Sequence, residues 1–133
     1  DQFAQRQVKK VYEAILSQPI CQLQGMIELP LWRDPSDRPK TCVEFQRGQP
    51  SLTEFRVLTP GARPRLCFVP HSGRTHQLRV HAAHPQGLNA PIVGDTLYGA
   101  KEQSERLQLH ARSIKFVHPT TGQSMDFNCP VPF

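Results

Sequence analysis

The stretch SGRTHQLRVHAAH, from Ser72 to His84, differs from the rest of the chain, where short strand-like segments prevail. Its apolar residues recur at the spacing of one helix face, and Pro85 follows where such a helix would end. We therefore predict one main helix over about residues 75–84, with Ser72 or Thr75 as its N-terminal cap. A strand precedes this helix directly, so its first turn is expected at a strand end, where a site can form.

The segments around this helix alternate polar and apolar residues and are rich in β-formers, which predicts strands. We expect them at residues 8–16, 25–29, 41–45, 51–58, 65–70, 107–118 and 125–132. A short connection with Gly48 joins 41–45 to 51–58, which is typical of a hairpin. Residues 32–40 hold two prolines and predict a loop, and residues 1–7 are expected to end a helix. Many strands with one helix indicate an α+β domain built on a mixed, mostly antiparallel sheet.

The size and composition of the chain indicate one small domain or a piece of one. It has 133 residues, of which 38% are hydrophobic, and it begins at Asp1 rather than at a methionine, which suggests a fragment. No apolar run approaches the length of a membrane helix, and no leader sequence is evident, so we expect a cytoplasmic protein without membrane contact. The cysteines are far apart and are expected to be reduced and buried: Cys21, Cys42, Cys67 and Cys129.

The charge balance is compatible with a polyanionic partner. Sixteen Lys and Arg against eleven Asp and Glu give a net charge of +5. Most of the basic residues are arginines, whose planar guanidinium binds phosphate through two hydrogen bonds and stacks on bases. Charge alone, however, leaves RNA or DNA binding open.

The densest polar cluster, PHSGRTHQLRVHAAH, contains four of the six histidines and has three interpretations. A metal site is disfavoured because His76 and His81 are five residues apart, whereas helical ligand pairs are separated by three or four, and no acidic residue is nearby. We therefore predict no metal. The cluster could instead be the solvated face of an amphipathic helix. It could also form a site for a carboxylate or phosphate, with Arg79 held at the core edge.

Four motifs together resemble the C-terminal half of the RluA-type RNA pseudouridine synthases. They are GRTHQLR (Gly73–Arg79), GDTLYG (Gly94–Gly99), LQLHA (Leu107–Ala111) and HPTTG (His118–Gly122), in the order of that family. Upstream, KKVYEAIL, PLWRDPSDRPK and GQPSLTEFRVL are similar to the strands that precede them. The resemblance covers residues 1–133 and implies the C-terminal part of a pseudouridine synthase catalytic domain.

The resemblance implies an isomerase that needs no cofactor and acts on ribosomal or transfer RNA. In that family a uridine is flipped into the site, an aspartate attacks, and the base rotates and rejoins through C5. Arg79 would pair with the catalytic aspartate, Tyr12 would lie against the base and assist at C5, and Leu78 would line the base pocket. Arg74 is expected to face RNA phosphate or a carboxylate, and His76 to order the turn by hydrogen bonds.

The catalytic aspartate itself is missing from the chain. In the family it belongs to an Arg-Leu-Asp motif upstream of the strand that holds Tyr12, and no aspartate here follows an Arg-Leu pair. We therefore expect the parent protein to be an enzyme and this fragment to be inactive alone. The alternative is a non-catalytic RNA-binding module of the same fold. Self-association through a sheet edge exposed in the fragment is a further expectation. Gly94 and Asp95 are expected to shape a turn.

Overall fold

The computed structural model describes residues 8–36, 40–99, 105–117 and 121–133, which form strands and one short helix. In chain order these elements are β1 (Lys9–Ile15), β2 (Gln24–Glu28), β3 (Leu31–Trp32), β4 (Cys42–Val43), β5 (Leu52–Thr59), β6 (Arg65–Pro70), α1 (Gln77–Ala83), β7 (Leu109–Val117) and β8 (Ser124–Asn128). The expected helix end at residues 1–7 lies outside the described residues.

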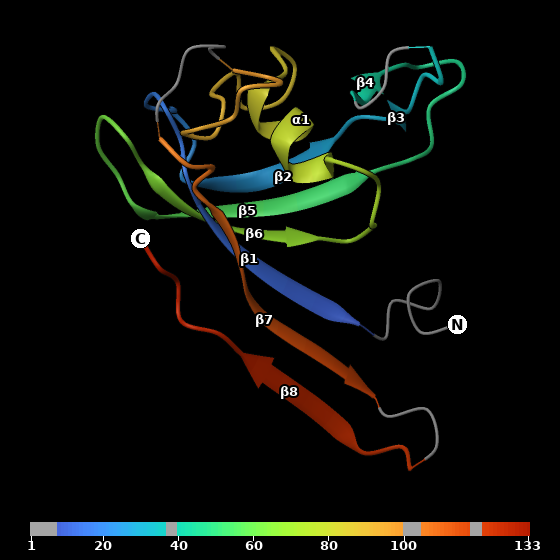
Figure 1. Cartoon of the computed structure of the whole chain (residues 1–133), viewed down its shortest axis with the longest axis vertical. Coiled ribbons are helices and arrows are strands. Elements are labelled where there is room, and N and C mark those ends of the chain that lie inside the picture. Colours follow the sequence, from blue (N-terminus) through green and yellow to red (C-terminus); the bar gives the residue numbers. More distant parts are fainter. Residues whose placement is uncertain (1–7, 37–39, 100–104, 118–120) are drawn as a thin grey trace.

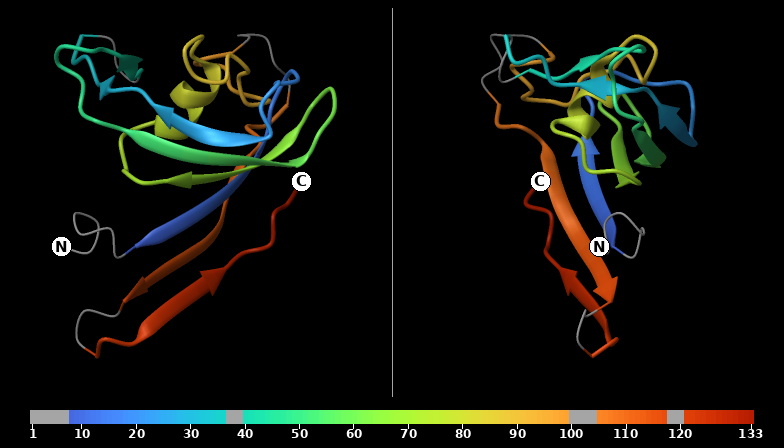
Figure 2. Two further views of the ribbon diagram at one scale, coloured as in Figure 1. Left: turned by 180° about the vertical axis from the view of Figure 1, so that it is seen from behind. Right: turned by 90° about the vertical axis from the view of Figure 1, so that its right-hand side faces the viewer.

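A six-stranded sheet in the order β2-β5-β6-β1-β7-β8 organises the fold, and each neighbouring pair in it is antiparallel. Helix α1 lies over the part of the sheet made by β2, β5 and β6, as Figure 1 shows. The β7–β8 hairpin extends away from the helix, so one end of the sheet is uncovered (Figure 2). The α+β class and the largely antiparallel sheet are therefore confirmed.

The core lies between the sheet and α1. Alternate residues of β1 and β6 face the helix, and Ala14, Leu66 and Phe68 have no exposed surface. Leu78 and Ala82 close this cluster from the helix side. Full burial of a side chain as large as phenylalanine stabilises a fold by roughly 1.5–3 kcal/mol, so these contacts fix α1 against the sheet.

The start of α1 differs from the prediction. Its N-cap residue is His76, which lies in the left-handed region at φ 55°, and no side-chain hydrogen bond caps the helix. The Ser72 hydroxyl does not cap the helix because it donates to Gln77 Oε1 over 2.7 Å, and Arg74 N–H donates to the same oxygen. Gln77 Nε2 donates in turn to Leu52 O and thereby joins the helix start to β5.

The hairpin predicted between residues 41–45 and 51–58 is wrong. Strand β4 pairs with β3, whereas β5 pairs with β2 and β6. The Gly48 segment closes a turn in which Gly48 N–H donates to Glu44 O, and Gln49 then pairs with Leu31 rather than extending a hairpin. The β3–β4 ribbon is therefore an insertion between two paired strands.

The cysteines are free, but they are not buried as expected. Cys21, Cys42 and Cys129 are exposed, and Cys67 is partly covered. Within the described residues, no helix has the length and apolar character needed to span a membrane.

Candidate functional site

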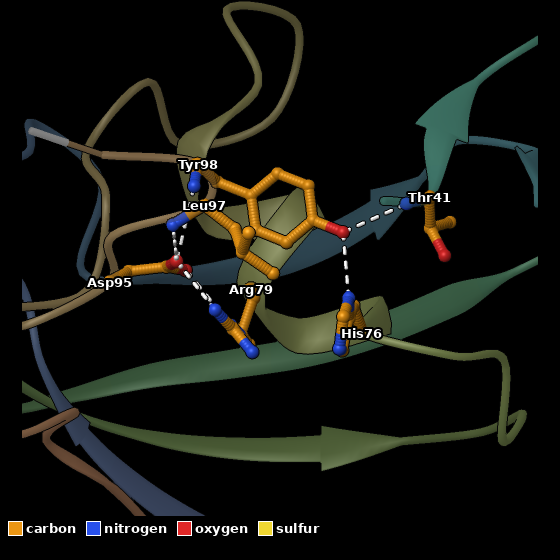
Figure 3. A network of polar contacts seen from close by, with 6 residues as sticks. All are labelled: Thr41, His76, Arg79, Asp95, Leu97 and Tyr98. Atoms are coloured by element: carbon orange, nitrogen blue, oxygen red, sulfur yellow. Dashed lines mark hydrogen bonds and ion pairs between the residues drawn. The ribbon is translucent and has the colours of Figure 1, made fainter. Parts of the chain in front are cut away.

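Arg79 on α1 and Asp95 in the 94–99 turn form a bidentate pair, shown in Figure 3. Arg79 Nη2 donates to Asp95 Oδ1 over 2.7 Å, and Nε donates to Oδ2 over 3.1 Å. The Asp95 side chain is fully buried, whereas 17% of the Arg79 side chain is exposed. The hydrogen bond to Asp95 raises the pKa of Arg79, so the guanidinium stays charged at the edge of the core.

Asp95 also shapes its own turn, as the sequence predicted. Its Oδ1 accepts the backbone N–H groups of Leu97 and Tyr98, each over 3.1 Å. Gly94, which precedes it, has φ 84°, and a Cβ there would lie 2.2 Å from Arg106 O. Only glycine fits this position without a shift of the backbone, which explains the Gly-Asp order in GDTLYG.

Tyr98 joins the turn to both the helix and the β3–β4 insertion (Figure 3). Its hydroxyl accepts the N–H of Thr41 over 2.8 Å and lies 2.7 Å from His76 Nδ1. Burial and, to a smaller extent, the nearby charge of Arg79 lower the pKa of His76. Burial raises the pKa of Tyr98. The neutral phenol therefore donates to a neutral imidazole. His76 orders this region by hydrogen bonding, as predicted.

The guanidinium of Arg79 keeps donors for another group. It lies 5.4 Å from the centre of the Tyr98 ring, and its hydrogen bonds to Asp95 use Nε and Nη2. Among the described residues Nη1 has no partner, so its N–H groups are available to an incoming oxygen. A charged donor beside a buried carboxylate and an aromatic ring can bind and orient an anion.

The remaining predicted site residues are Tyr12, Leu78 and Arg74. Tyr12 on β1 is half-buried and packs against the core cluster that includes Leu78, which is 6% exposed. Arg74 is exposed, and its Nε donates to Pro50 O over 3.2 Å. No hydrogen bond or ion pair between described residues joins these three to Arg79, and their roles with RNA stay predictions.

The interpretation of the histidine cluster as a solvated helix face is wrong. His81 is fully buried, with Nδ1 2.8 Å from Thr53 Oγ1 and Nε2 3.1 Å from Leu29 O. Burial lowers its pKa, which favours the neutral ring that donates through Nε2 and accepts through Nδ1. The described residues contain no group of three metal-ligating side chains.

Sequence reasoning missed the part that Tyr98, Asp95 and Thr41 play in this network. The GDTLYG motif contains Asp95 and Tyr98, but the sequence predicts only a turn formed by Gly94 and Asp95 and no role for Tyr98. Thr41 carries no such signal, because 57 residues separate it from Tyr98 along the chain.

Comparison with known proteins identifies the family. The model of the RNA pseudouridylate synthase family matches residues 1–84, which include β1, the sheet strands up to β6 and the whole of α1. The chain belongs to this family. Residues 1–84 contain Arg79 and His76. Asp95 and Tyr98 lie beyond residue 84, in a part of the chain that the similarity to individual relatives also covers.

Relatives in this family align over nearly the whole chain. The dual-specificity RNA pseudouridine synthase RluA of Pasteurella multocida (strain Pm70) is 39% identical over 137 residues, covering 99% of this chain and 61% of its own length. The enzyme of the same name from Escherichia coli (strain K12) is 38% identical with the same coverage. The chain thus spans about three fifths of the length of these relatives.

Two solved human structures share the fold. Human RNA pseudouridylate synthase domain containing 1 superposes with a TM-score of 0.82 at 31% identity, over 99% of this chain and 58% of that one. Human RNA pseudouridylate synthase domain containing 4 gives a TM-score of 0.78 at 26% identity, over 98% and 60%. The sheet and helix described above are therefore part of a pseudouridylate synthase domain.

Proposed function

We propose that this chain forms part of an enzyme that isomerises uridine to pseudouridine in ribosomal or transfer RNA, in the cytoplasm and without a cofactor. Membership of the RNA pseudouridylate synthase family supports the reaction, and the relatives named dual-specificity RNA pseudouridine synthase support an RNA substrate. The observation that carries the proposal is Arg79, a charged donor fixed by Asp95 with Nη1 available beside an aromatic ring.

In this proposal Arg79 holds the catalytic carboxylate. An aspartate from outside these 133 residues would accept from Nη1, and the positive charge would keep it ionised and oriented. The carboxylate attacks C1′ of the flipped nucleotide as the C1′–N1 glycosidic bond breaks. The freed base rotates, and its C5 then bonds to C1′ and displaces the carboxylate. The proton lost from C5 is balanced by a proton taken up at N1. Tyr12 would lie against the base and assist that proton transfer, with Leu78 as part of the apolar wall.

We further propose that the 133 residues alone do not catalyse the reaction. Asp95 is enclosed and accepts four hydrogen bonds, so it cannot reach a nucleotide. Asp34 binds its own loop through Ser36, and Asp126 is in an ion pair with Lys115. None of the aspartates follows an Arg-Leu pair.

The test compares the chain with the full-length protein that contains it. Each is incubated with uridine-containing ribosomal and transfer RNA, and pseudouridine is measured by mass spectrometry of the digested RNA. We expect product from the full-length protein, loss of product in its Arg79→Ala and Tyr12→Phe variants, and none from the chain alone. Pseudouridine formed by the chain alone would contradict the inactivity.

The lack of an Arg-Leu-Asp sequence favours a second candidate, a non-catalytic RNA-binding module of the same fold. It predicts RNA binding without pseudouridine, even with the full-length protein. The same digestion experiment separates the two, because a binding module leaves every uridine unchanged.

Self-association is a further proposal, and the edge strand β8 supports it. This strand pairs only with β7 in the described sheet, and it carries Phe127, which is 53% exposed and stacks on Phe116. An unpaired strand edge with an apolar side chain favours pairing with a second chain. A monomeric mass from solution scattering at high protein concentration would refute this proposal.

A further inference from the structure

A pocket lies next to the Arg79–Tyr98 network, where the β3–β4 insertion meets the segment before α1. It has a volume of about 500 Å³, within the range of roughly 300–1,000 Å³ that small-molecule sites occupy. We call it the Trp32 pocket, and the residues of its lining that matter here are Trp32, Arg33, Thr41, Arg47, Arg74 and Thr75. Thr41 also belongs to the Tyr98 network, so pocket and site are adjacent.

Positive charge predominates in the Trp32 pocket. Arg33 and Arg74 are exposed, and neither has a carboxylate partner among the described residues. Arg74 is nevertheless held in place, because its Nε donates to Pro50 O. Two guanidinium groups that have no carboxylate partner in the described part of the chain provide donors for the oxygens of a phosphate at one opening.

An aromatic platform forms another part of the lining. The guanidinium of Arg47 lies 3.7 Å from the centre of the Trp32 ring, and Glu44 holds it through an ion pair of 3.6 Å. Trp32 is only partly buried. Stacked guanidinium and indole groups are surfaces on which unpaired bases stack, independently of sequence.

One residue of the pocket lining, Thr41, has a buried hydroxyl without a partner. Thr41 is 4% exposed, yet its Oγ1 has no hydrogen bond in the described structure, although its backbone N–H is bound by Tyr98. An unpaired buried hydroxyl destabilises a protein, so it calls for an explanation. A ligand oxygen in the pocket would satisfy it.

We propose that the Trp32 pocket binds one nucleotide of single-stranded RNA that flanks the target uridine. Its phosphate contacts Arg33 and Arg74, its base stacks on the Arg47–Trp32 platform, and Thr41 Oγ1 binds a phosphate or ribose oxygen. This inference rests on the proposed function, because it assigns a neighbouring part of the same RNA to a neighbouring pocket. An acidic peptide would satisfy the charges but not the platform.

The chain provides its own probe, because Trp32 is its single tryptophan. The 133-residue chain is titrated with hexauridylate while the tryptophan fluorescence is recorded. We expect saturable quenching, and at least tenfold weaker binding for Arg33→Gln and Arg74→Gln. Both side chains are exposed, so these variants are expected to keep their melting temperature, which is measured alongside.

The matched control is Arg63→Gln, which removes the same charge from the turn between β5 and β6, at the opposite end of these strands from β3 and β4 (Figure 1). It should weaken binding by less than threefold. Equal effects of all three substitutions would overturn the proposal, because binding would then depend on net charge alone. Saturation without a fluorescence change, or equal quenching by polyglutamate, would also overturn it.

Thr41→Val separates binding from folding. Valine has the shape of threonine without the hydroxyl, so this variant should melt at the same or a higher temperature while binding hexauridylate three- to tenfold more weakly. Unchanged affinity would refute the role of Oγ1. Failure of the pocket leaves pseudouridine formation by the full-length protein intact, whereas failure of the isomerase proposal leaves the fluorescence titration unchanged, so the two are distinguishable.

Discussion

Arg79 and Asp95 are joined by two hydrogen bonds across 16 residues, and the carboxylate is fully buried while the guanidinium reaches the surface. This difference in burial indicates that the two residues have different roles. Asp95 is structural, because its oxygens are occupied by the guanidinium and by two backbone N–H groups. Arg79 is held by that carboxylate in a position from which Nη1 can bind a second group.

Loss of the Asp95 charge should destabilise the fold. Asp95→Asn keeps an oxygen for the turn but leaves Arg79 without a counter-charge, and breaking such a buried pair costs on the order of 3 kcal/mol. Urea unfolding followed by circular dichroism measures this loss. The control is Glu105→Gln, which removes the exposed partner of Arg63 and should change stability by less than about 0.5 kcal/mol. Equal stabilities of the two variants would contradict the structural role of Asp95.

Gly94 is the residue on which the position of Asp95 depends. Its φ of 84° is unfavourable for any residue with a Cβ, and that Cβ would overlap Arg106 O. We expect Gly94→Ala to lower the free energy of unfolding by on the order of 3 kcal/mol, through backbone strain and overpacking together.

Gly73 in GRTHQLR provides the matched control for this substitution. A Cβ there meets no atom within 4 Å, and its φ is not in the left-handed region. Gly73→Ala should therefore leave stability unchanged or raise it slightly. If both alanine variants unfold at the same urea concentration, the close approach at Gly94 is not what selects glycine.

The Tyr98 hydroxyl is predicted to hold the β3–β4 insertion against the 94–99 turn. Tyr98→Phe removes the acceptor of Thr41 N–H and the partner of His76, which should cost about 1–3 kcal/mol, because a part-buried donor is left unpaired. Hydrogen exchange measured by NMR should show faster exchange of the Thr41 amide than in the wild type.

Tyr12→Phe is the control for the loss of a tyrosine hydroxyl. In the described structure the Tyr12 hydroxyl has no hydrogen bond, so its removal should leave both stability and Thr41 exchange unchanged. An unchanged Thr41 exchange rate in Tyr98→Phe would show that the insertion is held by other contacts.

The local elements of this fold were predictable from the sequence because each has its own periodicity. Residues 65–70 alternate so that Leu66 and Phe68 are buried, and the structure has β6 at those residues. The pairing of the strands was harder to predict from the sequence. Residues 41–45 and 51–58 have the spacing of a hairpin, but Gly48 closes a turn that returns the chain to Leu31.

The candidate site was predictable only in part, for a physical reason. Motif resemblance pointed to Arg79 and His76 because both lie in one short segment. Their partners come from distant segments, since Asp95 and Tyr98 lie in a later turn and Thr41 in an earlier insertion. These contacts depend on tertiary packing, which the spacing of apolar residues within one segment does not determine. The left-handed backbone at His76 likewise carries no signal in the sequence.

Stability should fall as the pH decreases below about 6.5, because two histidines are held neutral. Burial lowers the pKa of His76 and His81 from the ordinary value of 6.5. The unfolded chain therefore binds protons more readily than the folded one, so the full stability is present above pH 6.5 and is lost as the pH falls through it. His81, which has no exposed surface, should contribute to this loss between pH 7.5 and 5.5.

The contribution of His81 can be isolated with His81→Gln. Glutamine is neutral at every pH and retains a donor for Leu29 O and an acceptor for the Thr53 hydroxyl, the two partners of the imidazole. Urea unfolding at pH 7.5 and 5.5 should show a smaller difference between the two pH values for this variant than for the wild type, whatever its absolute stability. A wild-type stability that is equal at both pH values would contradict the neutral buried ring, because a histidine that binds protons equally in both states gives no slope.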